Sequence, residues 1–211
     1  MHDPRTILEP GPLPIFTIDG LLTPEECAAL IRETERAGYR DAPITTARGF
    51  VMAKGVRNNT RYMVDDPARA RWLFERARPW LPQTLDDGDA ELLGLNERFR
   101  FYRYEREQYF RWHSDGSYAR TLAERSMLTL IVYLNDEGLE GGATEFTRCA
   151  AVQPKVGRAL VFAHGHRHQG APVLRGRKYV MRTDVMYRDP RLAERVQRRR
   201  ASLRGRGTSS P

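Results

Sequence analysis

The stretch "ERFRFYRYEREQYFRWHSDGSY" (residues 97–118) decides how the rest of the chain is interpreted. Its first half mixes arginines with aromatic residues from Arg98 to Tyr104 in a largely alternating run, a pattern typical of a half-buried β-strand. Its second half contains His113 and Asp115, whose side chains point the same way if the backbone stays extended. An isolated His-x-Asp pair is common by chance, so its meaning depends on what the remaining sequence supplies.

Further short strands are expected downstream of this stretch, with glycine- and proline-containing turns between them. They cover residues 126–135, 143–147, 158–164 and 178–187. Because no helical pattern separates these strands, an antiparallel sandwich or jelly roll is favoured over a parallel sheet. The predicted fold class is therefore mostly β with flanking helices, with a jelly-roll core over residues 96–187.

Two helices are expected before this core, in a supporting region that spans residues 14–95. The first opens with a capping box formed by Thr23 and Glu26, with proline at the first helical position, and it ends near Ala37. The second covers residues 66–78 and ends where prolines follow. We expect both helices to pack outside the sheet and to brace it.

The net charge of +8 is concentrated at the C-terminus of the 211-residue chain. From Arg188 onward there are eight arginines and only two acidic residues. We interpret residues 1–189 as one domain and residues 190–211 as a basic, flexible tail. A solvated tail is favoured over a contact with nucleic acid or an acidic partner, because the body of the chain is nearly neutral.

The chain has neither a long apolar run nor the basic and apolar blocks of a signal peptide at its N-terminus. A cytoplasmic location without membrane association is therefore expected. The two cysteines, Cys27 and Cys149, are too few for a disulfide framework, although a single bridge between them stays open. Cys27 falls on the apolar side of the first helix and is expected in the core.

A metal site of two histidines and one carboxylate needs a second histidine from a distant strand. The stretch "HGHRHQGAPV" (residues 164–173) offers three candidates, His164, His166 and His168. Such a triad binds non-haem iron(II) and leaves positions open for substrate and oxygen.

The order of these motifs resembles the catalytic domain of prolyl 4-hydroxylases, which are iron(II)- and 2-oxoglutarate-dependent dioxygenases. The resemblance covers roughly residues 96–187 and rests on these segments together: Tyr104, "HSD" (113–115), "LNDEGLEGGATEF" (134–146), "PKVGRALVF" (154–162), "HQGAPV" (168–173) and "GRK" (176–178). It implies a double-stranded β-helix fold. It also implies iron held by His113, Asp115 and His168.

The family places a basic residue ten positions after the distal histidine, where it binds the far carboxylate of 2-oxoglutarate. Lys178 stands ten positions after His168, whereas His164 and His166 are followed at that distance by Leu174 and Gly176. The resemblance therefore assigns the ligand role to His168, and the other two histidines are interpreted as loop or supporting residues.

Further cosubstrate residues follow from the same resemblance. Tyr104 and Thr144 are expected to bind 2-oxoglutarate, although each is also compatible with a purely structural role. Arg182 shares a strand face with Lys178, so it is either an assisting or alternative cosubstrate clamp or a partner in a salt bridge with Asp184. Phe110 stands where many family members have tyrosine.

The departure at Phe110 removes a hydroxyl group, and Tyr109 beside it is a candidate to replace that group. The cofactors implied by the resemblance are Fe(II), 2-oxoglutarate and O₂, with ascorbate as a further candidate. The expected reaction is hydroxylation, because the halogenating relatives lack a carboxylate at the position of Asp115.

A proline or peptidyl-proline-like compound is the expected substrate, either a small molecule or a peptide. Candidate substrate-binding residues come from the polar stretch "VRNNTRY" and from the region after the metal motif; they are Arg57, Asn58, Asn59, Arg61 and Tyr118. Each of them is also compatible with an ordinary loop position.

Three other functions compete with this prediction. A nucleic-acid demethylase of the same superfamily is disfavoured, because Val185 stands where such enzymes use arginine. A non-catalytic, cupin-like binding module is disfavoured by the joint presence of three ligands and a cation at the right spacing. An interaction module built on the arginine-rich tail is the third alternative.

Overall fold

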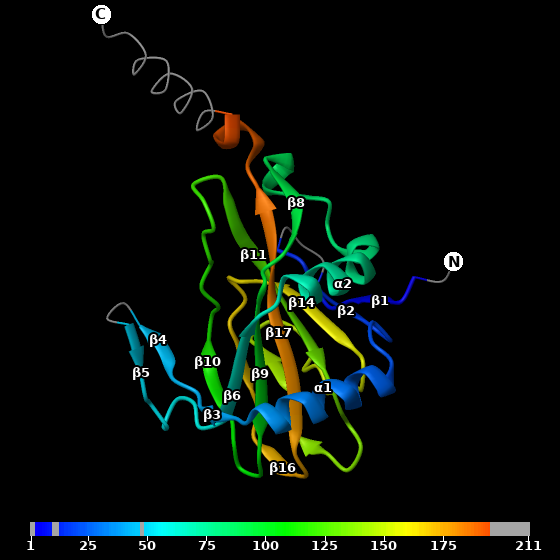
Figure 1. Ribbon diagram of the computed structural model, residues 1–211, viewed down its shortest axis with the longest axis vertical. Coiled ribbons are helices and arrows are strands. Elements are labelled where there is room, and N and C mark those ends of the chain that lie inside the picture. Colours follow the sequence, from blue (N-terminus) through cyan, green and yellow to red (C-terminus); the bar gives the residue numbers. More distant parts are fainter. Residues whose placement is uncertain (1–2, 10–12, 47–48, 195–211) are drawn as a thin grey trace, which may run out of the picture.

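The computed structural model describes residues 3–9, 13–46 and 49–194, and it is built around one large antiparallel sheet (Figure 1). The main strand order is β1-β2-β14-β11-β17-β9-β6-β3, while β8 pairs with the second half of β17 and β7 pairs with β8. The strands are β1 (Arg5–Ile7), β2 (Ile15–Ile18), β3 (Arg40–Asp41), β6 (Thr60–Asp65), β7 (Thr84–Leu85), β8 (Ala90–Leu95), β9 (Arg98–Tyr104), β11 (Glu124–Tyr133), β14 (Ala159–Ala163) and β17 (Lys178–Arg188).

A second, three-stranded sheet faces the large one and closes the jelly roll. It has the order β10-β15-β13, with bounds Phe110–His113, His168–Gly170 and Thr144–Phe146. Aromatic and aliphatic side chains from both sheets fill the space between them, including Tyr133 and Phe162 from the large sheet and Phe146 from the small one. Burial of these large apolar side chains is what holds the two sheets face to face.

Two further strand pairs extend from the sandwich. One pairs β12 (Glu140–Gly141) with β16 (Val173–Arg175), next to the start of β17. The other is a hairpin of β4 (Ile44–Thr46) and β5 (Gly49–Val51), which projects from the side of the molecule in Figure 1.

Helices α1 (Pro24–Ala37) and α2 (Pro67–Ala77) cover the outer face of the large sheet (Figure 1). The predicted capping box is confirmed: the Thr23 hydroxyl accepts a hydrogen bond from the Glu26 amide at 3.2 Å, and the Glu26 carboxylate accepts one from the Thr23 amide at 2.9 Å. Cys27 is fully buried in the core between helix and sheet, as expected. Two short 3₁₀ helices, η1 (Arg78–Trp80) and η2 (Asp86–Gly88), follow α2.

The predicted mostly β architecture is confirmed, and each of the expected strands over residues 97–187 corresponds to one of β9, β11, β13, β14 and β17. Residues 14–95, however, form more than a helical brace. They contribute five strands to the large sheet, of which β6 pairs with β9 from Thr60 opposite Arg103 to Asp65 opposite Arg98. Local composition does not reveal such strands, because their pairing depends on the edge that β9 offers.

Residues 195–211, which make up most of the predicted basic tail, lie outside the described residues. Within the described part of the chain, no helix combines the length and the apolar character needed to cross a bilayer.

Candidate active site

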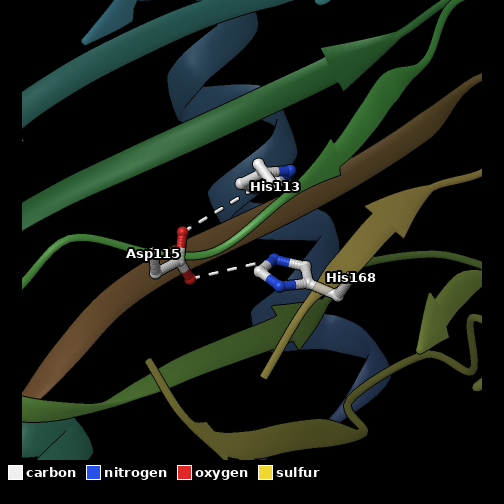
Figure 2. A group of neighbouring side chains, drawn as sticks. All are labelled: His113, Asp115 and His168. Atoms are coloured by element: carbon white, nitrogen blue, oxygen red, sulfur yellow. Dashed lines mark ion pairs between the residues drawn. The ribbon is translucent and has the colours of Figure 1, made fainter. Parts of the chain in front are cut away.

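His113, Asp115 and His168 converge at one end of the small sheet (Figure 2). His113 ends β10 and His168 begins β15, and these two residues are direct partners in the antiparallel register. One ligand atom from each of the three residues lies within 4.8 Å of the others. The Nε2 atoms of His113 and His168 are 3.7 and 3.8 Å from the two Asp115 carboxylate oxygens, close enough to share one metal ion at ligand distances of about 2.1 Å.

Both histidines are oriented by the backbone. The Nδ1 atom of His113 lies 2.7 Å from the Arg111 carbonyl oxygen, and that of His168 lies 3.0 Å from the His166 carbonyl oxygen. A carbonyl oxygen only accepts, so each Nδ1 carries the proton, and each Nε2 presents a lone pair toward Asp115. This tautomer is the one that binds a metal ion through Nε2.

The charge states of the three groups also suit a divalent cation. Burial, together with the neighbouring His168, lowers the pKa of His113 to about 4, and burial likewise lowers the pKa of His168. Burial alone would raise the pKa of Asp115, but Arg182 and the two histidines outweigh it and hold that pKa well below its usual range. At neutral pH the site therefore offers two neutral imidazoles and one carboxylate.

Both oxygens of the Asp115 carboxylate have protein partners. Oδ1 lies 2.8 Å from Nη1 of Arg182, and Oδ2 accepts a 2.6 Å hydrogen bond from the Thr129 hydroxyl. Arg182 also pairs with Asp184 at 3.2 Å, which is the salt bridge that the sequence allowed. These contacts fix the orientation of the ligand carboxylate from outside the metal position.

His164 extends this hydrogen-bonded chain. Because Thr129 donates its proton to Asp115, its oxygen accepts from Nδ1 of His164 at 3.0 Å, which leaves Nε2 of His164 to accept from Ser126 at 2.9 Å. His166 instead contacts the Leu13 carbonyl oxygen at 3.1 Å, through Nε2. Neither His164 nor His166 joins the cluster. Of the three candidate histidines, the structure therefore brings only His168 to His113 and Asp115.

A cavity lies beside the triad, between the two sheets. Its lining residues are Tyr102, Tyr104, Phe110, His113, Ile131, Thr144, His168, Gly170, Lys178, Val180 and Arg182. Lys178 sits opposite Tyr104 in the pairing of β17 with β9 and is almost fully buried. Its ammonium group donates to the Gly142 carbonyl oxygen at 2.5 Å, and no described carboxylate pairs with it.

This buried cation is costly to leave without an anion. Burial lowers the pKa of Lys178 to about 7, and its ammonium nitrogen lies 5.2 Å from the ring centre of Tyr104 and 5.5 Å from that of Tyr133. Gly142 is needed here because its backbone has a φ of +67° and an added Cβ would lie 3.1 Å from the lysine side chain.

The two other predicted cosubstrate residues line the same cavity. Thr144 is buried and its hydroxyl accepts a 2.6 Å hydrogen bond from Tyr133. Tyr104 is also buried, and burial raises its pKa to about 12, so it is a neutral hydrogen-bond donor. With Lys178, these residues place one cation and two hydroxyl groups around the cavity, a set that matches a carboxylate.

The candidate substrate residues have varied surroundings, and none of them lines the cavity itself. Arg57 and Asn59 are buried, and Nε of Arg57 donates to the Asn59 side-chain oxygen at 2.7 Å. Arg61 is partly buried opposite Tyr102 in the pairing of β6 with β9. Tyr118 is 44% exposed and stands outside this group.

The suggestion that Tyr109 replaces the hydroxyl missing at Phe110 is wrong. The Tyr109 hydroxyl faces away from the cavity and lies 3.5 Å from the Gly55 carbonyl oxygen, because alternate residues of a strand point to opposite sides. Phe110 lies in the cavity wall and stacks on the His113 ring, with 3.6 Å between ring centres.

Several residues of the site had no signal of their own in the sequence. Thr129 and Tyr133 reach it from β11, and Tyr102 reaches it from β9. Thr129 and Tyr133 share the inner face of their strand, since they are four residues apart. That periodicity was available, but which inner-face residues meet the triad depends on the sheet register.

Comparison with known proteins agrees with this geometry. The sequence profile of the 2OG-Fe(II) oxygenase superfamily matches residues 99–183, the segment that holds the triad and Lys178. No curated protein is found as a relative of this chain.

Solved structures of prolyl hydroxylases share the fold. A viral collagen prolyl hydroxylase from Paramecium bursaria Chlorella virus 1 has a TM-score of 0.56 and 20% identity, over 82% of this chain and 95% of that one. A Pseudomonas putida prolyl-4-hydroxylase has a TM-score of 0.62 and 18% identity, over 81% of this chain and 91% of that one.

A prolyl hydroxylase from Trichoplax adhaerens, solved in complex with a hypoxia-inducible factor peptide fragment, has a TM-score of 0.59 and 15% identity over 84% of both chains. At these identities the likeness establishes a common fold, and the profile match shows similarity to the superfamily over residues 99–183. Residues 99–183 therefore match a 2-oxoglutarate-dependent Fe(II) oxygenase domain, and the chain shares its fold with prolyl hydroxylases.

Proposed function

We propose that this enzyme hydroxylates a C–H bond of a proline or peptidyl-proline-like substrate, with residues 1–189 as one oxygenase domain. Fe(II), 2-oxoglutarate and O₂ would supply the oxidising chemistry, in which decarboxylation of 2-oxoglutarate to succinate is coupled to insertion of a hydroxyl group. The observation that carries the proposal is the convergence of His113, Asp115 and His168 beside a buried lysine that has no described acidic partner.

His113, Asp115 and His168 are the proposed iron ligands. The two imidazoles present their Nε2 lone pairs because their Nδ1 protons are held by backbone carbonyl oxygens. Asp115 supplies the negative charge, and its contacts with Arg182 and Thr129 hold it in place. A set of two nitrogens and one oxygen suits Fe(II) and leaves the remaining positions to ligands that come from outside the protein.

Lys178 is the proposed partner for the far carboxylate of 2-oxoglutarate, with Tyr104 and Thr144 as hydrogen-bonding groups. Lys178 needs an anion and lines the same cavity as the two proposed histidine ligands. Arg182 lines this cavity too, but it already pairs with both Asp115 and Asp184. We therefore assign Arg182 mainly to holding the ligand carboxylate and Lys178 to binding the cosubstrate.

The substrate assignment rests on the likeness to three prolyl hydroxylases, one of them solved with a bound peptide. Arg57, Asn59, Arg61 and Tyr118 are the proposed substrate-binding residues. Ascorbate is proposed as the reductant that keeps the iron in the Fe(II) state. A cytoplasmic location completes the proposal, supported by the two cysteines, which are both free thiols.

The test is succinate formation from 2-oxoglutarate by protein purified anaerobically, loaded with Fe(II) and then exposed to oxygen. We expect turnover by the wild type, loss of turnover in His113→Ala and His168→Ala, and a much higher 2-oxoglutarate requirement in Lys178→Ala. His166→Ala is the matched control, because it removes a neighbouring histidine whose side chain contacts the Leu13 carbonyl oxygen and the Phe146 ring but does not join the triad. This control should behave as the wild type does.

Two results would contradict the proposal. Equal turnover in wild type and His168→Ala would show that the triad takes no part in the reaction. Metal binding by the wild type without any succinate would instead support the non-catalytic, cupin-like binding module.

A further inference from the structure

Arg57 is a buried cation without a carboxylate partner in the described structure. Only 4% of the residue is exposed. Its Nε donates to the Asn59 side chain at 2.7 Å, whereas its Nη2 is buried and has no hydrogen-bond partner. A buried guanidinium nitrogen that lacks a partner is costly, so its persistence calls for an explanation.

The position of Arg57 is held by two aromatic rings. Its guanidinium centre lies 4.4 Å from the ring centre of Tyr102 and 4.4 Å from that of Phe110. Phe110 in turn stacks on His113, with an angle of 18° between the ring planes. A single aromatic ring therefore separates the guanidinium of Arg57 from a proposed iron ligand.

Backbone contacts keep this segment in place. Arg57 forms an antiparallel bridge with Phe110, and the Arg111 amide donates to the Val56 carbonyl oxygen at 2.9 Å. The Tyr109 amide donates to the Asn58 side chain at 2.8 Å. The orientation of Arg57 is thus fixed before any ligand arrives, which lowers the entropic cost of binding.

A second cation adds to the positive charge at this place. Arg61 lies opposite Tyr102 in the strand register and has no ion pair among the described residues. Burial lowers its pKa, and although the nearby Tyr102 hydroxyl acts in the opposite direction, Arg57, Arg100 and Arg98 lower the pKa further, as expected for like charges close together. An anion between or beside them would relieve this repulsion.

The other charges of the site are already matched. Arg182 pairs with Asp115 and Asp184, and Arg100 pairs with Asp184 at 3.2 Å. Lys178 is assigned to 2-oxoglutarate, and Arg57 does not line the cavity that holds Lys178. No carboxylate of the described chain or of the cosubstrate is left for Arg57 and Arg61. The acidic group beside them is the buried Tyr102 hydroxyl, whose pKa is lowered because Arg57, Arg182 and Arg100 outweigh the effect of burial.

We propose that Arg57, assisted by Arg61, binds a carboxylate of the compound that is hydroxylated, so that the enzyme acts on an acidic proline-like substrate. This inference rests on the proposed function and narrows its substrate class. The planar guanidinium fork, with one nitrogen free, is suited to a carboxylate. That carboxylate belongs either to free proline or to an acidic residue next to a peptidyl proline.

Two pairs of probes separate these sources and isolate the charge. The first pair is L-proline and L-prolinamide. The second pair is the acetylated, C-terminally amidated peptides Gly-Pro-Glu-Gly and Gly-Pro-Gln-Gly. Binding to protein loaded with Fe(II) and 2-oxoglutarate is measured anaerobically by calorimetry, and the KM of each probe is measured by substrate-stimulated succinate formation.

We expect the carboxylate member of one pair to bind at least about tenfold more tightly than its amide, as charge-assisted hydrogen bonds require. The ratio of the two affinities, carboxylate over amide, should fall to near one in Arg57→Gln. It should persist in part in Arg57→Lys, which retains the charge. Arg106→Gln is the control, because it removes the same charge from an exposed turn, and it should keep the full preference. Thermal unfolding verifies that each variant is folded.

The outcomes distinguish this inference from the function on which it rests. If the wild-type protein forms no succinate at all, both the proposed function and this inference are wrong. Substrate-free succinate formation, with both carboxylate probes binding no better than their amides, would overturn only the inference. A wild-type preference that is unchanged in Arg57→Gln and Arg57→Lys would overturn it as well, since the carboxylate would then bind elsewhere.

Discussion

Arg182 and Asp115 form a buried ion pair, with 2.8 Å between Nη1 and Oδ1, at the point where the proposed iron ligand meets the sheet. The two residues come from β17 and from the loop after β10, 67 positions apart in the chain. The pair holds the carboxylate in its ionised form and directs it toward the two histidines. Arg182 therefore orients the proposed ligand carboxylate, whereas Lys178, on the same strand face, has no described acidic partner and is the proposed cosubstrate residue.

Substitution of these two cations should separate metal binding from cosubstrate binding. We expect Arg182→Gln to weaken Fe(II) affinity by about 10- to 100-fold, because Asp115 loses its orienting partner. Lys178→Met should weaken 2-oxoglutarate binding while it leaves Fe(II) affinity nearly unchanged. Equilibrium dialysis for iron and calorimetry for 2-oxoglutarate measure the two effects. The reverse pattern would identify Arg182 as the cosubstrate clamp.

Removal of the Thr129 hydroxyl should also weaken the metal site. Thr129→Val keeps the side-chain shape but leaves Asp115 Oδ2 and the Nδ1 proton of His164 without their shared partner. We expect Fe(II) affinity to fall by about tenfold or more, as for other groups that orient a metal ligand. Thr129→Ser retains the hydroxyl and serves as the control. Equal affinity in the valine and serine variants would show that the hydroxyl does not orient Asp115.

The binding of 2-oxoglutarate should become weaker as the pH rises above neutrality. Burial lowers the pKa of Lys178 to about 7 in the ligand-free protein, so at higher pH the lysine must take up a proton before it pairs with a carboxylate. We expect affinity to fall by about tenfold for each pH unit above 7, which calorimetry on metal-loaded protein between pH 6.5 and 9 will measure. Lys178→Met should bind weakly and without this pH dependence.

Lys178 should also make stability depend on pH, but here the free energy of unfolding should rise with pH, whereas 2-oxoglutarate affinity falls. Between about pH 7 and the ordinary value of 10.5, the unfolded chain retains a proton that the folded protein has lost. The contribution of Lys178 to the free energy of unfolding should therefore rise with pH in this window, by up to about 1.4 kcal/mol per unit. Denaturant unfolding of wild type and Lys178→Met at several pH values isolates this contribution. A wild-type curve parallel to that of the variant would contradict the lowered pKa.

The cap of α1 should contribute to stability without affecting catalysis. Thr23→Ala removes the side chain that accepts from the Glu26 amide, and we expect it to lower the free energy of unfolding by about 1 kcal/mol. Thr23→Ser should retain most of that stability. Chemical denaturation measures both variants, and an unchanged midpoint for Thr23→Ala would mean that water caps the helix equally well.

Local patterns determined much of the fold. The capping box that starts α1 and the alternation that marks β9 and β17 are visible in short stretches, because they arise from the periods of helix and strand. The same reasoning predicts that His113 and Asp115 share one side of an extended segment. In contrast, β6 was not predicted, since it owes its place between β9 and β3 to strand pairing rather than to its own composition.

Tertiary structure alone decided which residues meet at the site. His113 and His168 face each other because of the register between β10 and β15, and that register also leaves His164 to support Asp115 through Thr129. The stack of Arg57 on Phe110 likewise depends on a bridge between distant segments. Contacts of this kind depend on how whole strands pair and pack, so the sequence by itself names the residue types of the site and only the assembled sheets determine their partners.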